Sequence, residues 1–152
     1  MEHEAHQIFG ASPVWSIFFL PEGKFPMRFI PTRIHGIADY LTGLLLIVAP
    51  FLFGFADGSA AQWVPMIVGG GILIISLLTD YELSLARLIP MPVHLGIDGA
   101  GGLLLLASPW LFGFADRVLW PHVIIGVLEI GAALMTRTAP DTAEAGLGRT
   151  HS

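Results

Sequence analysis

The fold is decided by a stretch that occurs twice, as IPTRIHGIADYLTGLLLIVAPFLFGFAD at residues 30–57 and as IPMPVHLGIDGAGGLLLLASPWLFGFAD at residues 89–116. The two copies align without a gap and share a His, an Asp, a Gly, a Pro and the whole run LFGFAD. After a short deletion a weaker match continues, which pairs Trp63 with Trp120, Gly69 with Gly126 and Thr79 with Thr136. The chain is therefore a tandem duplication.

The composition predicts that this duplication is immersed in lipid. Of 152 residues, 54% are hydrophobic and 12% are charged, and the mean hydropathy is +0.73. Soluble domains carry about a quarter charged residues, roughly twice this share. The chain has no cysteine, which excludes disulfides, iron–sulfur clusters and thiol nucleophiles. A net charge of −5 leaves no basic footprint for nucleic acid.

Each copy contains two apolar segments, which predicts an all-α membrane protein with four transmembrane helices. The first segments, Ile34–Phe53 and His94–Gly113, are long enough to cross about 30 Å of hydrocarbon. The second segments, Trp63–Thr79 and Trp120–Thr136, are at the low end of the spanning range. Because each copy has an even number of spans, we expect two tandem two-helix repeats that run parallel, related by a pseudo-twofold axis along the membrane normal.

A repeated motif marks the end of the first helix in each copy. A glycine stands where a left-handed cap residue is wanted, and a proline in the last turn frees a carbonyl and bends the helix tip. The aromatic residues of the motif predict an interfacial belt at this end of the helices. The motif consists of Pro50, Phe51 and Gly54 in the first copy, and of Ser108, Pro109, Trp110 and Gly113 in the second.

The positions of the basic residues predict the orientation of the chain. They lie before, between and after the two copies, and only Arg117 lies at the other end of the helices. The positive-inside rule then places both termini in the cytoplasm. The residues on the cytoplasmic side are Lys24, Arg28, Arg33, Arg87, Arg137 and Arg149.

The same reasoning divides the chain into five parts. The apolar stretch 8–20 is too short to span a bilayer, which predicts a segment that lies in the membrane interface or docks on protein. The parts are an N-terminal interfacial segment with a basic linker (1–29), the first repeat (30–82), a cytoplasmic connector (83–88), the second repeat (89–137) and a flexible tail (138–152).

The second copy resembles the SPW-repeat family of small bacterial integral membrane proteins. It carries SPW at residues 108–110, at the end of a membrane helix, with His94 and Asp98 upstream; the first copy has APF at residues 49–51. The resemblance covers about residues 30–137. It implies a pair of two-helix repeats in the bacterial inner (plasma) membrane, and it implies no settled activity.

Two pairs of polar residues lie inside the predicted membrane helices, His35 with Asp39 and His94 with Asp98. The i, i+4 spacing puts each pair on one helix face, and the pseudo-twofold axis brings both pairs to one depth. Each Asp can accept a hydrogen bond from its own His, so that the pair satisfies itself where helices cross, without a cofactor. Alternatively, the four side chains converge as a divalent metal site or a proton-holding cluster, or the two histidines ligate a b-type haem.

One carboxylate, Glu129, falls near the centre of the last helix, where the first copy has Ile72. An ionised carboxylate at mid-bilayer is costly, so Glu129 is expected to be neutral or paired. It is either a proton site or polar contact to a partner helix, or a neutral acid that donates to a carbonyl, to Ser76 or to Thr42.

In the connecting loop, Asp80, Tyr81, Glu82 and Arg87 are expected to be solvated and locally paired, with docking to a partner as the alternative.

No nucleophile stands at a sensible spacing from a base, so the sequence predicts no enzymatic activity. We expect a non-catalytic accessory or scaffolding subunit that packs against a larger membrane complex or against itself. One alternative is a small proton-coupled carrier or ion-handling protein that uses Glu129 with the His/Asp pairs. Another is a redox membrane anchor that holds haem or a metal between His35 and His94.

Overall fold

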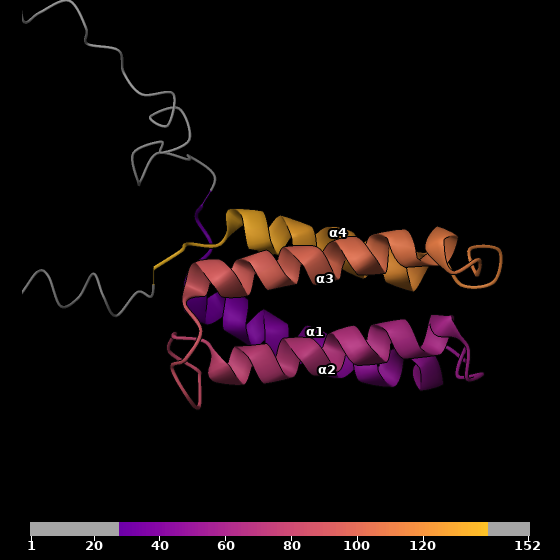
Figure 1. Ribbon diagram of the computed structural model, residues 1–152, viewed down its shortest axis with the longest axis horizontal. Helices are drawn as coiled ribbons and strands as arrows, with labels where there is room; N and C mark the ends of the chain where they lie inside the picture. Colours follow the sequence, from indigo (N-terminus) through magenta and orange to yellow (C-terminus); the bar gives the residue numbers. More distant parts are fainter. Residues whose placement is uncertain (1–27, 140–152) are drawn as a thin grey trace, which may run out of the picture.

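A computed structural model describes residues 28–139, which form four helices. The prediction of an all-helical chain is confirmed. Three of the helices are long and apolar enough to cross a membrane, and the fourth, of 16 residues, is shorter. The proposed interfacial segment at residues 8–20 lies outside the described residues, as does the tail from residue 140. The helices are α1 (Thr32–Leu52), α2 (Ala60–Leu78), α3 (Met91–Leu111) and α4 (Trp120–Met135) (Figure 1).

The first helix of each copy begins earlier than its apolar pattern predicts. α1 begins at Thr32 and α3 at Met91, each directly after a proline with extended backbone, Pro31 or Pro90. The added residues are Thr32 and Arg33 in α1, which are polar, and Met91, Pro92 and Val93 in α3, where a proline occupies the first turn. The earlier starts make each histidine of the predicted polar pairs the fourth residue of its helix, His35 in α1 and His94 in α3.

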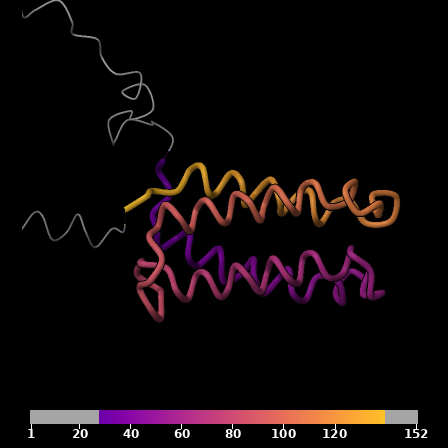
Figure 2. The backbone as a smooth tube through the Cα atoms, in the orientation of Figure 1, coloured from indigo at the N-terminus to yellow at the C-terminus, as the bar shows by residue number. Residues whose placement is uncertain are grey.

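The helices form two hairpins that lie side by side (Figures 1 and 2). α1 packs along α2 and α3 along α4, and α2 touches α3 between the hairpins. Both hairpin turns lie at one end of the bundle, which we call the turn end. The loop from α2 to α3 and both ends of the described chain lie at the opposite end, which we call the connector end.

Paired glycines let the two helices of each hairpin approach to backbone contact. In the first hairpin, a Cβ added to Gly43 or to Gly69 would lie 2.9 or 2.6 Å from the carbonyl oxygen of the other glycine. In the second hairpin, the corresponding distances for Gly102 and Gly126 are 2.9 and 2.7 Å. Small residues serve helix contact in lipid, where association depends on close packing. The glycines therefore set the spacing of both hairpins.

The predicted glycine caps at the ends of α1 and α3 are confirmed. Gly54 and Gly113 adopt positive φ angles of 72° and 69°, the left-handed conformation that a helix cap requires. Pro109 lacks the N–H that would bond the carbonyl of Leu105, and the Ser108 hydroxyl donates to that carbonyl at 2.8 Å. The serine of SPW thus satisfies the carbonyl that the proline leaves free.

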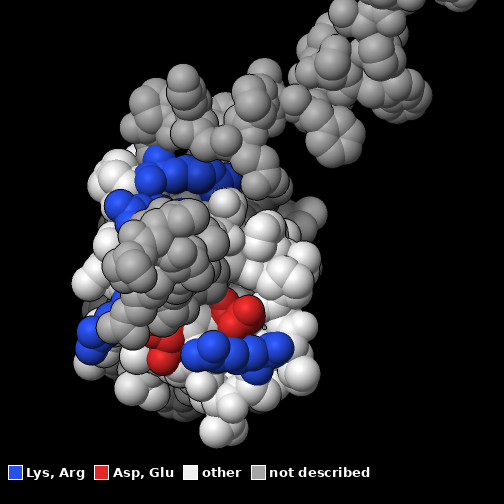
Figure 3. All heavy atoms as spheres, turned by 90° about the vertical axis from the view of Figure 1, so that its left-hand side faces the viewer, with Lys and Arg blue, Asp and Glu red and all other residues white. Residues whose placement is uncertain are grey.

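The outward surface is apolar along the helices and charged at the connector end. Leu41, Ile67 and Leu128 are each more than 60% exposed and are positioned to face lipid. Phe51 and Trp110 of the repeated motif also point outward, 62% and 59% exposed. Figure 3 views the connector end and shows Lys, Arg, Asp and Glu side chains gathered there.

Candidate functional site

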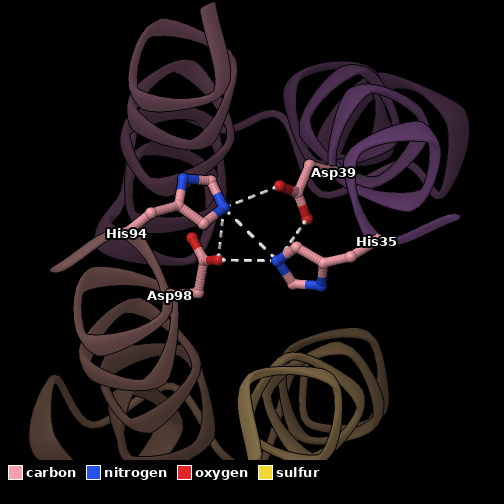
Figure 4. A group of neighbouring side chains, drawn as sticks. All are labelled: His35, Asp39, His94 and Asp98. Atoms are coloured by element: carbon pink, nitrogen blue, oxygen red, sulfur yellow. Dashed lines mark hydrogen bonds and ion pairs between the residues drawn. The ribbon is translucent and has the colours of Figure 1, made fainter. Parts of the chain in front are cut away.

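The two predicted polar pairs meet at one point between α1 and α3 (Figure 4). His94 Nε2 lies 2.9 Å from Asp39 Oδ2 and 2.9 Å from Asp98 Oδ2. His35 Nε2 lies 3.1 Å from Asp98 Oδ2 and 3.4 Å from Asp39 Oδ1, and the two Nε2 atoms are 3.3 Å apart. Each of the four residues is at most 2% exposed. We call these four residues the His–Asp centre.

The contacts within the His–Asp centre cross from one copy to the other. Each histidine touches the aspartate of its own helix, as the i, i+4 spacing predicts. Each also touches the aspartate of the other copy, from His35 to Asp98 and from His94 to Asp39. Buried polar groups need partners, and here the partner of each hairpin is the other hairpin. The centre therefore joins the two copies.

A threonine holds each histidine ring from outside the centre. Thr79 Oγ1 lies 2.7 Å from the carbonyl oxygen of Ile75 and 2.8 Å from His94 Nδ1. Because a carbonyl has no hydrogen, the hydroxyl hydrogen lies between the two oxygens, and Thr79 accepts a hydrogen bond from Nδ1–H. Thr136 does the same for His35, at 2.7 Å from the carbonyl one turn back and 3.1 Å from Nδ1. Both rings therefore carry a proton on Nδ1 and turn Nε2 inward.

The backbone at the connector end brings these threonines to the histidines. Ile30 forms an isolated parallel bridge with Thr136, and Ile89 forms one with Thr79. Ile30 and Ile89 occupy the same position in the two copies, and so do the two threonines. The segment that precedes each first helix thus runs beside the end of a second helix, and the two copies make equivalent contacts.

The two aspartates differ in their support. Ser76 donates a hydrogen bond to Asp39 Oδ2 at 2.9 Å. In the second copy Ala133 stands at the position that matches Ser76. Within residues 28–139, the buried Oδ1 atom of Asp98 has no hydrogen-bond partner. One carboxylate oxygen of the centre is therefore unsatisfied.

Tyr81 corrects the expectation of a solvated connector loop. Its side chain is 1% exposed, its ring centroid lies 6.2 Å from that of His94, and a Cβ at Gly36 would collide with the ring. Burial raises the pKa of the Tyr81 phenol well above its ordinary value of 10.0, so the ring stays neutral. Asp80 and Arg87 do pair locally as expected, at 3.6 Å in solvent.

Glu129 lies beside the His–Asp centre and not in it. Glu129 is 5% exposed. A Cβ added to Gly102, which lies one turn along α3 from Asp98, would be 2.9 Å from the Cβ of Glu129. Thr42, one predicted partner, lies beside it, whereas Ser76 donates to Asp39 instead. In the part of the chain that the structure describes, Glu129 Oε2 has no hydrogen-bond partner.

His122, at the turn end, has a structural role that the sequence analysis missed. Pro65 lacks an N–H and so frees the carbonyl of Ala61 one turn earlier in α2. His122 Nε2 donates to that carbonyl at 3.1 Å, from the other hairpin. Its ring packs against Phe55 and Phe114, with centroids 5.8 and 4.9 Å away. Pro65, inside an apolar helix, was the signal in the sequence, because a buried carbonyl that a proline leaves free needs a hydrogen-bond donor from elsewhere.

The His–Asp centre suits a small charge rather than a haem. When two histidines bind a haem iron from opposite faces, the porphyrin ring fills the space around the line that joins their Nε2 atoms. Here Asp98 Oδ2 lies within 3.1 Å of both Nε2 atoms and occupies that space. Protons or a bare cation fit between the four groups, whose nitrogen and oxygen atoms all lie within 4.8 Å of one another.

Fold and site together define a multi-pass helical membrane protein whose two hairpins meet at buried polar side chains. The chain belongs to the SPW repeat domain family, whose model matches residues 33–136. The resemblance of the SPW motif at residues 108–110 is thereby confirmed. No curated protein and no solved structure matches the chain.

Proposed function

We propose that the chain is a non-catalytic accessory or scaffolding subunit, which packs against a larger membrane complex or against a second copy. The main support for this proposal is that the polar side chains within the helices point into the bundle. All four residues of the His–Asp centre face inward, bond across the two copies and are at most 2% exposed. Such groups specify how helices assemble, and they offer no reactive atom to a substrate.

The outward glycines support the docking part of this proposal. A Cβ added to Gly70, Gly71, Gly96 or Gly131 meets nothing within 4 Å, in contrast to the glycines that face each other inside the hairpins. These positions lie on α2, α3 and α4. In lipid, small residues of this kind let a neighbouring helix approach closely. They offer contact surfaces that the chain itself does not use.

The distribution of charge supports an orientation with the connector end in the cytoplasm of a bacterium. Arg33, Arg87 and Arg137 belong to that end, whereas Arg117 belongs to the turn end. This is the asymmetry that the positive-inside rule associates with cytoplasmic loops. Reporter fusions at residues 57 and 87 test it, because they are expected to fall in opposite compartments.

Gentle extraction from native membranes tests the accessory role. The expected result is an oligomer or a complex of fixed stoichiometry. Gly96→Leu should weaken that assembly and leave the helical circular dichroism unchanged, because the added side chain protrudes from the surface. Leu103→Ile is the matched control at an exposed apolar site on the same helix. A monodisperse wild-type monomer, with no stoichiometric companion, would contradict the proposal.

A second candidate, a proton-coupled carrier, is favoured by the unsatisfied Oε2 of Glu129 beside the His–Asp centre. Four spans enclose little volume, so a carrier would require at least a dimer. In proteoliposomes, proton-coupled flux should be lost in Glu129→Gln while the variant remains folded. Flux that is absent from the wild type, or unchanged in the variant, would remove Glu129 from any transport mechanism.

A further inference from the structure

We propose that the His–Asp centre binds one divalent transition-metal ion of tetrahedral preference, with Zn²⁺ as the archetype. The ligands are His35 and His94 through Nε2 and Asp39 and Asp98 through one carboxylate oxygen each. This goes beyond the accessory role, which requires no metal.

The spacing of the four groups is that of a ligand set. Zn²⁺ binds nitrogen and oxygen at about 2.0–2.2 Å, so the ligand atoms of a tetrahedral site lie roughly 3.3–3.6 Å apart. The nitrogen–oxygen contacts across the His–Asp centre run from 2.9 to 3.4 Å, the two Nε2 atoms are 3.3 Å apart, and one ligand atom from each of the four residues lies within 4.8 Å of all the others. A rearrangement of the two carboxylates completes the tetrahedral shell around an ion placed among the four groups.

The threonines prepare the histidines for a cation. Since Nδ1–H is committed to Thr79 in one ring and Thr136 in the other, each ring presents Nε2 to the centre, which is the atom that can bind a metal ion. The two Nε2 atoms then face each other and two carboxylates, an arrangement that positive charge among them stabilises. A divalent ion supplies two charges and balances the two carboxylates, so the buried centre becomes neutral.

The surroundings provide the second layer of contacts that metal sites use. Ligating histidines characteristically donate their other N–H to an oxygen, which fixes the ring and its tautomer. Thr79 and Thr136 accept those bonds, and Ser76 orients Asp39. The second oxygen of Asp98, buried and without a hydrogen-bond partner in residues 28–139, can approach the same ion.

The donor set selects the class of metal. Two imidazoles with two carboxylates suit Zn²⁺ and its neighbours Co²⁺ and Fe²⁺, whereas Ca²⁺ and Mg²⁺ require six or more oxygen ligands. With four protein ligands and complete burial, the site has the closed form of a structural site and leaves no position for substrate. The ion therefore pins α1 to α3.

Metal content of the full-length protein in detergent tests the proposal. The purified protein, stripped with chelator and dialysed against Zn²⁺ alone, is expected to retain one equivalent. Co²⁺ in its place should give the intense visible bands of a tetrahedral ion. His94→Gln should lose the metal, and His122→Gln, which removes an equally buried histidine at the turn end, should keep it. Wild-type protein that retains no Zn²⁺ or Co²⁺, or equal retention in both variants, would overturn the proposal.

Two further measurements test the metal site without the His94→Gln variant, which is useful if that variant does not fold. X-ray absorption of the Zn²⁺-loaded wild type should show a four-atom nitrogen and oxygen shell with two imidazoles; a six-coordinate shell would refute the site. Thr79→Val, which leaves every ligand in place, should weaken Zn²⁺ binding by about 10- to 100-fold. Affinity unchanged in Thr79→Val would refute the role assigned to the threonines. None of these results depends on a partner, so they stand apart from the accessory role.

Discussion

The two copies of the repeat make equivalent contacts at the histidines of the connector end, and they differ at several positions elsewhere in the bundle. His35 and His94, their aspartates, and the threonines that hold them occupy equivalent positions and make equivalent contacts. Several other equivalent positions have diverged: Ser76 matches Ala133, Ile72 matches Glu129, and APF matches SPW, whereas the glycines that set the spacing of the hairpins and the run LFGFAD are shared. The side chains that complete each other across the copies have remained paired. Among the elements that serve a single hairpin, the glycine contacts are shared, whereas positions such as Ile72 and Glu129 differ.

The largest effect is expected where the copies complete each other. His94→Ala removes a ring that lies between two buried carboxylates, and such losses cost about 3–5 kcal/mol of the free energy of unfolding. If the copies are equivalent, His35→Ala costs the same within error, and the double variant costs less than the sum because both rings share partners. Unfolding in mixed micelles, followed by circular dichroism, measures all three. A loss confined to one histidine would break the equivalence.

Much of this fold could be predicted from the sequence, because helices in lipid are determined locally. Apolar length defined the four helices, the glycine caps followed from the backbone, and duplication pointed to both His/Asp pairs as possible neighbours. The partners of those pairs could not be predicted. Thr79, Ser76 and Tyr81 reach the centre only through the packing of one helix on another, and nothing in their own spacing encodes that approach. The repeated threonine was a signal, but its meaning required the bridge to Ile89.

The glycine contacts test whether both hairpins pack in the same way. Gly69→Ala and Gly126→Ala each place a Cβ against a backbone carbonyl, and overpacking of this kind costs about 1–3 kcal/mol. Gly70→Ala is the control, since its Cβ enters open space and should change stability by about 0.5 kcal/mol or less. The same unfolding assay applies. Unequal losses at Gly69 and Gly126 would show that the hairpins differ in how far their backbones can separate.

The serine–alanine difference offers a way to restore the symmetry. Ser76→Ala leaves Asp39 without its donor and should cost about 1–3 kcal/mol. Ala133→Ser supplies the matching donor to Asp98, whose Oδ1 lacks a partner in the described chain, and should add about 0.5–1.5 kcal/mol. Exchange of the two residues between copies then tests whether the centre is symmetric. Destabilisation by Ala133→Ser would mean that the second copy has no space for a donor.

The smallest effect is expected at the turn end, in the solvent-exposed link between the two hairpin turns. Asp57 accepts a hydrogen bond from the backbone N–H of Ser59 and pairs with Arg117 of the other hairpin, while the second copy has no serine in its turn, residues 112–119. The bonds from Ser59, together with Arg117, lower the pKa of Asp57 from 3.8 to about 2. A lowered pKa stabilises the fold at every pH above 3.8, and the contribution is lost as the pH falls through about 2.

Asp57→Asn should therefore flatten the decline in stability between these two pH values and leave the slope above them unchanged. The pair is exposed to solvent, so the difference between variant and wild type should be small and should shrink at high salt. Arg117→Gln should produce part of the same flattening, because Ser59 remains. An equal slope in wild type and Asp57→Asn would mean that the link between Asp57 and Arg117 is absent in solution, and that apolar packing, His122 and the connector end join the hairpins without it.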